Sequence, residues 1–329
     1  MQMSNGTSQQ ITEFILVGVP GLQDSQNLLC IIFLLAYFIV ITGNLLILSL
    51  VILDQRLHTP MYFFLCHLAV LDIMLSTIIL PKMFAVFLLN DKSISVAGCF
   101  TQMYLVLAIG GTENVILIVM AYDRYVAIMK PLHYHVIING KLCVLLAIVA
   151  WILGHMVPVP ALIQAMPLIF CGPNKIEYCY CDYPTVVSLA CEDVTAVIEN
   201  AFVAAMCITN IPFLLIICSY VRIIKTIAGM KKDDRKKALS TCVSHLLIVL
   251  IYYFSADLLY ITALTHSSTQ DTRVIIGVFA YILAPILNPI IYSLRNKQIK
   301  QAAEKYLAFL FRPQNAEPLV TNGEVSKIA

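Results

Sequence analysis

Seven long runs of apolar residues, separated by short polar stretches, constrain the fold of this chain more than any other feature. A helix needs roughly 20 apolar residues to cross the hydrocarbon core of a bilayer. Lipid cannot hydrogen-bond the backbone, so spans are helices or closed barrels, and these runs are continuous rather than alternating. We therefore expect membrane helices near residues 28–52, 61–86, 99–128, 141–164, 196–226, 237–264 and 272–294.

The composition agrees with a chain that faces lipid. Hydrophobic residues make up 60% of the 329 residues and charged residues 12%, against about 25% charged in soluble domains. After the last run, apolar side chains recur at helical spacing, which predicts an amphipathic helix on the inner leaflet. We expect an all-α membrane protein, a seven-transmembrane helix bundle with a short amphipathic eighth helix. Its parts would be an extracellular N-terminus (1–27), a transmembrane domain (28–294) and a cytoplasmic helix and tail (295–329).

Positively charged residues indicate the orientation, because Lys and Arg gather on the cytoplasmic side of membrane proteins. One side of the expected membrane carries most of them, including the cluster Lys231, Lys232, Arg235, Lys236 and Lys237. The other side carries only Lys82, Lys92, Lys175 and Arg273. This places the N-terminus outside, where the sequon at Asn5 predicts glycosylation. Beside helix ends, the basic cluster indicates topology rather than a nucleic-acid partner.

Five cysteines fall on the expected outer side, where disulfides persist. They are Cys99, Cys171, Cys179, Cys181 and Cys191. No His joins them at zinc-site spacing, so disulfides are favoured over a metal. Five is odd, so at least one thiol is left over. The cysteines in or near the spans are interpreted as small buried hydrophobes.

Asp72 and Glu113 are ionisable residues inside the second and third spans, where such groups usually face the bundle interior and are functional. Two carboxylates at one depth could share a sodium ion or a proton. The alternative is a hydrogen-bonded structural pair with one neutral member. The residues do not decide between these, and we expect no other cofactor.

Two further motifs are candidates for a conformational switch. Asp123-Arg124-Tyr125 ends the third span, where an adjacent Asp can hold the guanidinium in one state and release it in another. The alternative is a plain interfacial anchor in which Arg124 reaches to lipid headgroups. In the seventh span, Pro289 removes a backbone hydrogen bond and Asn288 can bridge to Asp72. A proline kink that serves only packing remains the alternative.

Enzyme and transporter functions find no support in the sequence. It contains no Gly-x-Ser-x-Gly, His-Glu-x-x-His or phosphate-loop motif, and no spacing marks a catalytic triad. Transporters often have inverted repeats and broken half-helices, and neither is visible. These observations favour a receptor.

The ordered motifs resemble the rhodopsin-like G-protein-coupled receptors. They are Gly43-Asn44, Leu68-Ala69 with Asp72, Asp123-Arg124-Tyr125, Trp151, Pro212, Tyr220 and Asn288-Pro289 with Tyr292. Four segments are similar to signatures of the odorant (olfactory) receptors: Leu57–Leu65, Met120–Ile128, Lys237–Leu246 and Pro285–Asn296. Phe170–Asn174 and Tyr180–Asp182 resemble the fish-type branch.

The resemblance implies disulfides between Cys99 and Cys181 and between Cys171 and Cys191. It implies that a small odorant binds between the helices and shifts a pre-existing balance toward an active state. Asn44 would belong to the polar core, and Arg124, Tyr220 and Tyr292 would rearrange as a stimulatory, olfactory-type G protein docks and cyclic AMP rises. The location would be the plasma membrane of olfactory cilia. The alternative is a non-olfactory chemosensory receptor for a metabolite.

The resemblance places the ligand pocket in the outer halves of the third, fifth, sixth and seventh helices. The residues that we expect to line it are Val106, Leu107, Gly110, Gly111, Ala204, Ile208, Tyr253, Ala256, Asp257, Tyr260, Val278 and Tyr281. Tyr253, Asp257 and Tyr260 share one helix face. A carboxylate in an apolar pocket is costly unless it is paired. One hypothesis is that Asp257 pairs with a cationic ligand, an amine or amino acid. The alternative is a protonated or tyrosine-bonded Asp257 and a neutral ligand.

Overall fold

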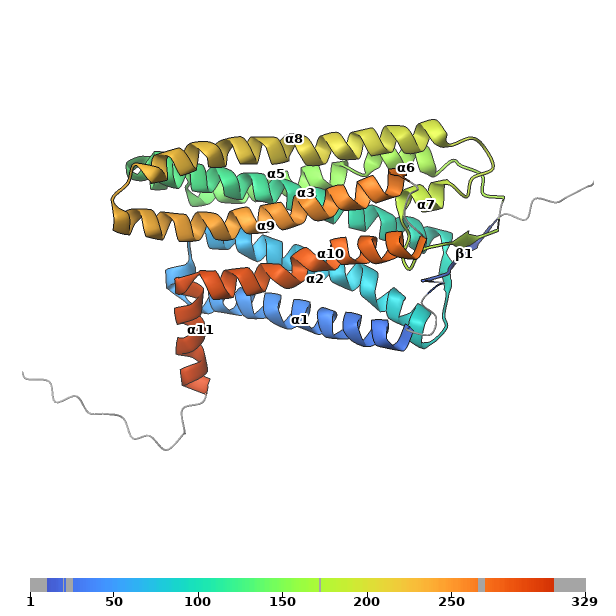
Figure 1. Cartoon of the computed structure of the whole chain (residues 1–329), viewed down its shortest axis with the longest axis horizontal. Coiled ribbons are helices and arrows are strands. Elements are labelled where there is room, and N and C mark those ends of the chain that lie inside the picture. The colour runs from blue at the N-terminus through green and yellow to red at the C-terminus, as the bar shows by residue number, and fades with distance from the viewer. Residues whose placement is uncertain (1–10, 20, 22–25, 172, 266–269, 311–329) are drawn as a thin grey trace, which may run out of the picture.

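The computed structural model describes residues 11–19, 21, 26–171, 173–265 and 270–310, and within them seven helical segments are long and apolar enough to cross a membrane. The prediction of a seven-helix bundle is therefore confirmed (Figure 1). The segments are α1 (Gln26–Leu53), α2 (Pro60–Leu88), α3 (Val96–Met129), α5 with α6 (Gly140–Met156 and Val159–Ala165), α8 (Thr195–Ala228), α9 (Lys232–Thr265) and α10 (Gln270–Arg295).

An additional helix, α11 (Lys297–Leu310), turns across the end of the bundle, and strand β1 (Glu13–Leu16) lies at the opposite end (Figure 1). Tyr306 of α11 donates a hydrogen bond of 2.7 Å to the Leu53 carbonyl at the end of α1. Tyr62 of α2 donates to the side chains of Asn296 and Gln298. These bonds hold α11 against the ends of two membrane helices.

Local sequence explains where several helices begin and break. The Ser95 and Asn139 side chains accept hydrogen bonds of 3.0 Å from backbone N–H groups in the first turns of α3 and α5, as N-cap residues do. The fourth span, expected as one helix near 141–164, is divided at Val157 and Pro158. Pro158 and Pro160 each lack the N–H that would continue the backbone bonding of α5.

α3 is the most buried span, packed against α2, α5, α8 and α9, and α8 is the least buried. Many large apolar side chains remain on the outside of the bundle, among them Phe38, Ile52 and Leu214 at 65%, 71% and 61% exposure. An apolar surface of this extent marks an interaction surface rather than a face exposed to water. Around the middle of the spans, that partner is lipid.

The end of the bundle that carries β1 is covered by a three-stranded sheet of order β2-β1-β3. β1 pairs antiparallel with β2 (Ser93–Ser95) and parallel with β3 (Lys175–Ile176). The loop that carries β3 also forms the short helix α7 (Tyr183–Val187). The opposite end carries α4 (Tyr134–Ile137) and two single 3₁₀ turns, Gln55–Leu57 and Pro131–His133.

Candidate functional site

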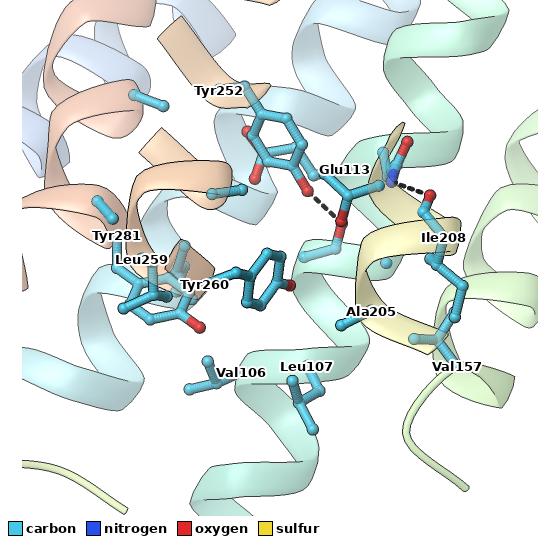
Figure 2. A pocket seen from close by; sticks show the side chains of 18 of the residues that line it. Val106, Leu107, Glu113, Val157, Ala205, Ile208, Tyr252, Leu259, Tyr260 and Tyr281 are labelled. Carbon is cyan, nitrogen blue, oxygen red and sulfur yellow. Dashed lines mark hydrogen bonds between the residues drawn. The ribbon is translucent and has the colours of Figure 1, made fainter. Parts of the chain in front are cut away.

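An inner cavity of about 110 Å³ lies between α3, α8, α9 and α10. Sites for drug-sized ligands usually have roughly 300–1,000 Å³, so this one suits a small molecule. Figure 2 shows Tyr252, Glu113 and Ile208 at one end of the cavity and Val106 and Leu107 at the other. The lining residues are Leu75, Val106, Leu107, Gly110, Gly111, Glu113, Asn114, Val157, Ala205, Ile208, Thr209, Tyr252, Ala256, Leu259, Tyr260, Ala280, Tyr281, Ala284 and Pro285.

Eight of the twelve residues expected in the pocket line this cavity: Val106, Leu107, Gly110, Gly111, Ile208, Ala256, Tyr260 and Tyr281. Ala204, Tyr253, Asp257 and Val278 do not belong to its described lining. Ala204 is exposed on the outside of α8, and its neighbour Ala205 lines the cavity instead. One residue along a helix is a rotation of about 100°, so an assignment wrong by one position changes the face.

Asp257 lies between α8 and α9, where the Asn210 amide donates to its Oδ1 at 3.0 Å. The carboxylate is partly buried and has a partner in the protein, so a ligand is not needed to satisfy it. The carboxylate that does line the cavity belongs to Glu113.

Asn114 is a cavity residue that the sequence analysis missed. Its amide donates to the Ile208 carbonyl at 2.9 Å, and its Oδ1 accepts from the Tyr253 hydroxyl at 2.6 Å. The Ile208 carbonyl lacks its usual donor because Pro212, four residues later, has no N–H. A proline in a long apolar run was therefore the available signal that a polar side chain must lie near the fourth residue before it.

A polar cluster adjoins the cavity at Glu113. Asn288 donates to both carboxylate oxygens of Asp72, at 3.2 and 3.0 Å. Glu113 is 2% exposed and interacts electrostatically with Asp72. Glu113 Oε1 and Ser76 Oγ are buried and find no hydrogen-bond partner among the described residues. The two carboxyl groups that the sequence singled out are thus within electrostatic range of each other.

Asn44 supports the same region from α1. Its amide donates to the Val40 carbonyl at 3.0 Å and to the Pro285 carbonyl at 3.3 Å. Pro289 leaves the Pro285 carbonyl without an intrahelical donor. Gly43 lets α1 approach this kink, since a Cβ there would lie 2.9 Å from Pro289 Cγ.

At the C-terminal end of α3, Arg124 forms an ion pair with its neighbour Asp123. The Asp123 carboxylate also accepts a hydrogen bond of 2.6 Å from Tyr134 of α4. Burial, and then the bond to Asp123, raises the pKa of the Tyr134 phenol well above its usual range, so the phenol stays a donor. Tyr125 is partly buried against the core. The Asp123 carboxylate therefore has a charged partner, Arg124, and a neutral one, Tyr134, and it holds the guanidinium in place.

Tyr220 of α8 and Tyr292 of α10, both predicted switch residues, lie within electrostatic range of Arg124. The Tyr220 hydroxyl shares a hydrogen bond of 2.6 Å with His245 Nδ1 of α9. His245 was recognised as part of a motif but not as a site residue. The Tyr292 hydroxyl and His245 Nε2 are buried with no partner in the part of the chain that the structure describes. Unpaired polar atoms around Arg124 favour a site with more than one stable arrangement.

Disulfides join Cys99 to Cys181 and Cys171 to Cys191, the pairings that the resemblance implies. Cys179 is free and fully buried, and burial raises the pKa of its thiol to about 12. The neutral thiol is a poor nucleophile, so it does not exchange readily with the neighbouring disulfide. Burial also raises the pKa of Asp182 to about 6, although Thr185 donates to it at 3.1 Å.

Comparisons with known proteins agree with one another. A sequence model of the family described as "Olfactory receptor" matches residues 33–309. "Olfactory receptor 6N1" of Homo sapiens is 43% identical over 306 residues, which cover 93% of this chain and 98% of that protein. "Olfactory receptor-like protein OLF3" of Canis lupus familiaris is 40% identical over 309 residues, covering 94% and 97%. "Olfactory receptor 2AT4" of Homo sapiens is 41% identical over 297 residues, covering 90% and 92%.

Proposed function

This chain belongs to the olfactory receptor family, and from that membership we propose that it binds a small odorant in the inner cavity and activates a stimulatory, olfactory-type G protein that raises cyclic AMP. The family is one of multi-pass membrane receptors and not of enzymes. The observation that carries the proposal is the sharing of helices. α3, α8, α9 and α10 line the cavity and also hold Arg124, Tyr220, His245 and Tyr292 at the other end.

A ligand between these four helices can act on the far end because each helix is a rigid element. A ligand that prefers one packing of the helices shifts the population toward it by its difference in affinity. The contacts at the cytoplasmic end would then change together: the ion pair of Arg124 with Asp123 and the bond of Tyr220 to His245. Release of the guanidinium would open a surface for the G protein.

The test is a cyclic AMP reporter assay in transfected cells, screened with amines, amino acids, carboxylic acids and neutral odorants. Arg124→Ala should reach the cell surface and give less than about a tenth of the wild-type response, because the charged group that rearranges is absent. Lys130→Ala is the matched control, since it removes an exposed positive charge just beyond the same helix. Full signalling by Arg124→Ala would contradict the switch role.

The chemical class of the ligand is a separate proposal. The sequence hypothesis of a cationic ligand rested on Asp257, which is paired with Asn210 outside the described cavity lining. If an amine activates the receptor, Glu113→Gln should weaken the response at least tenfold and Asp257→Asn should change it little. A larger loss in Asp257→Asn than in Glu113→Gln would instead support Asp257 as the partner of the cation. The response of the receptor to a neutral agonist should not show this tenfold loss in either variant.

We also propose that a sodium ion binds between Asp72 and Glu113. Hard cations take oxygen ligands, and the Asp72 carboxylate and the unpartnered oxygens of Ser76 and Glu113 are of this kind. The sodium ion would supply the positive charge that balances the two carboxylates, and Asn288 would orient Asp72. The melting temperature of the purified receptor should rise in sodium chloride relative to choline chloride. The Asp72→Asn variant should lose that difference.

The orientation follows as a proposal from the charge distribution of the sequence, and the location follows from the family membership. We place the N-terminus outside and the receptor in olfactory cilia, and we propose glycosylation of Asn5, which lies outside the described residues. An N-terminal tag on intact cells should bind antibody and a C-terminal tag should not. Expression away from olfactory neurons would instead favour a chemosensor for a metabolite.

A further inference from the structure

A groove of about 340 Å³ opens on the membrane-facing side of the bundle, between α5, α3 and α8. It exists because α5 and α8 both pack on α3 but hardly contact each other along the described residues. The groove lies near the midpoint of α3, at the depth of the hydrocarbon core. Its lining is almost entirely apolar: Gly111, Asn114, Val115, Ile118, Val157, Cys207, Ile208, Ile211 and Pro212.

The groove and the inner cavity share a wall. Gly111, Asn114, Val157 and Ile208 line both spaces. Gly111 contributes no side chain, and a Cβ at that position would lie 3.1 Å from Val157 Cγ2 and from the Gly154 carbonyl oxygen. The barrier between lipid and cavity is therefore about one side chain thick at this point.

The helical hydrogen-bond pattern of the backbone is interrupted on both sides of this wall. Val157 occupies the break between α5 and α6, and Ile208 precedes Pro212 in α8. Ile208 is 38% exposed toward the groove side. Val157 and Ile208 line both spaces, so they are the side chains whose rotation would join them.

The route from the water outside is covered more thoroughly. Tyr178, Cys179, Tyr180 and Cys181 are between 0% and 7% exposed. Tyr178 donates to the Arg273 carbonyl at 2.9 Å, and the backbone N–H of Cys181 donates to Gln102 at 2.9 Å. The Tyr180 ring lies edge-on to Tyr281, a cavity residue, with 5.7 Å between ring centroids. A ligand that enters this way must displace a loop held by a disulfide to Cys99.

We propose that ligands of this receptor enter the inner cavity sideways from the bilayer, through the groove between α5, α3 and α8, past the side chains of Val157 and Ile208. The occupant is a small neutral apolar molecule dissolved in the membrane. A charged molecule is excluded because its transfer to the bilayer centre is costly. The inference rests on the proposed odorant cavity but not on G-protein coupling, so its test needs no signalling.

The test measures how fast a thiol inside the cavity reacts. Ala256 lines the cavity but not the groove, and the variant Ala256→Cys/Cys207→Ser places a thiol there. The receptor in lipid nanodiscs is treated with hexyl methanethiosulfonate or with its charged trimethylammonium-ethyl counterpart. Mass spectrometry follows the peptide that carries residue 256. The apolar reagent should react at least tenfold faster than the charged one.

Tryptophan substitutions then plug the groove. Ile211→Trp should slow the apolar reaction at least tenfold, because the indole fills the groove from α8. Leu215→Trp is the matched control, one turn further along a similarly exposed face, at 61% against 57% for Ile211. Val157→Phe plugs from the other side and replaces Ile211→Trp if that variant does not fold.

Three results would overturn the inference. They are an unchanged rate in both plugged variants, an equal rate with the charged reagent, and no reaction at residue 256 while Cys218, exposed on α8 of the same molecules, is modified. A receptor that passes this test and yet fails to raise cyclic AMP would contradict only the coupling proposal.

Discussion

At the scale of single residues, two asparagine side chains replace backbone hydrogen bonds that two prolines remove. Pro212 and Pro289 leave the carbonyls of Ile208 and Pro285 without helical donors, and the amides of Asn114 and Asn44 supply one each. In hydrocarbon no water can replace these donors. The prolines therefore leave neither of these two carbonyls without a donor, and the asparagines tie these points of α8 and α10 to α3 and α1.

A double-mutant cycle tests this relation. Asn114→Ala should lower the free energy of unfolding by about 1–2 kcal/mol, since the Ile208 carbonyl and the Tyr253 hydroxyl both lose a partner. In a Pro212→Ala background the same change should cost about 1 kcal/mol less, because the backbone N–H at position 212 then serves Ile208. Thermal unfolding of the four purified variants measures this difference. Strictly additive changes would show that Asn114 does not compensate for Pro212.

At the scale of helices, close approach of α3 and α5 depends on Gly111 and Gly154, which face each other. A Cβ at Gly154 would lie 2.6 Å from the Thr112 Cα and would collide with the Thr112 backbone N and hydroxyl. The obstacle is backbone, which cannot rotate away as a side chain does. The distance between these two helices also sets the position of Val157 in the wall between groove and cavity.

Gly154→Ala should therefore force α3 and α5 apart and destabilise the receptor by about 1–3 kcal/mol or more. Surface expression and the melting temperature should both fall. Gly140→Ala in the same helix is the control, because a Cβ there meets nothing within 4 Å. It should be neutral or stabilise by up to about 1 kcal/mol through helix propensity. Equal behaviour of the two variants would sink the packing argument.

At the scale of the whole molecule, strand β1 and the loops that carry β2 and β3 are joined to one another over one end of the bundle. β1 bridges β2 and β3, segments about 80 residues apart in the chain, and the Cys99–Cys181 disulfide connects the same two regions. Asp182 lies directly after this bridge with a pKa raised to about 6 by burial. The charge state of one carboxyl thus affects how well this end of the bundle packs.

The raised pKa of Asp182 determines the direction in which stability changes with pH. Asp182 has a pKa of about 6 in the folded state, against an ordinary pKa of 3.8 for an aspartate side chain, so the folded state keeps this proton up to about pH 6. Between these values the folded protein binds more protons than the unfolded one, so stability falls as pH rises from about 4 to 6 and stays lower above. Asp182→Asn should remove this fall and raise the melting temperature at pH 7, with little change at pH 4. Scanning fluorimetry across this range measures it.

Asp193→Asn is the control of opposite sign. A hydrogen bond from Thr195 lowers the pKa of Asp193, which is exposed, so its charged form belongs to the folded state. Its replacement should give no gain in melting temperature at pH 7. A gain equal to that of Asp182→Asn would mean that general charge reduction, and not burial of Asp182, explains the effect.

The sequence by itself determined the architecture. Lipid forces every span to satisfy its own backbone, so continuous apolar runs specified seven helices, and helical periodicity specified the amphipathic helix α11. Ordered motifs also identified the family and its paired carboxylates, since ionisable groups in such runs must face inward.

Only the tertiary structure decided which side chains reach the cavity and which bond to one another. Ala205 in place of Ala204, the pairing of Asp257 with Asn210 and the bridging by Asn114 depend on helix rotation and on breaks at prolines. When nearly all sides of a helix are apolar, periodicity does not show which side faces lipid and which faces the protein interior. Both environments select apolar residues. Packing between helices resolves that ambiguity. It also produces the groove, which no sequence pattern predicts.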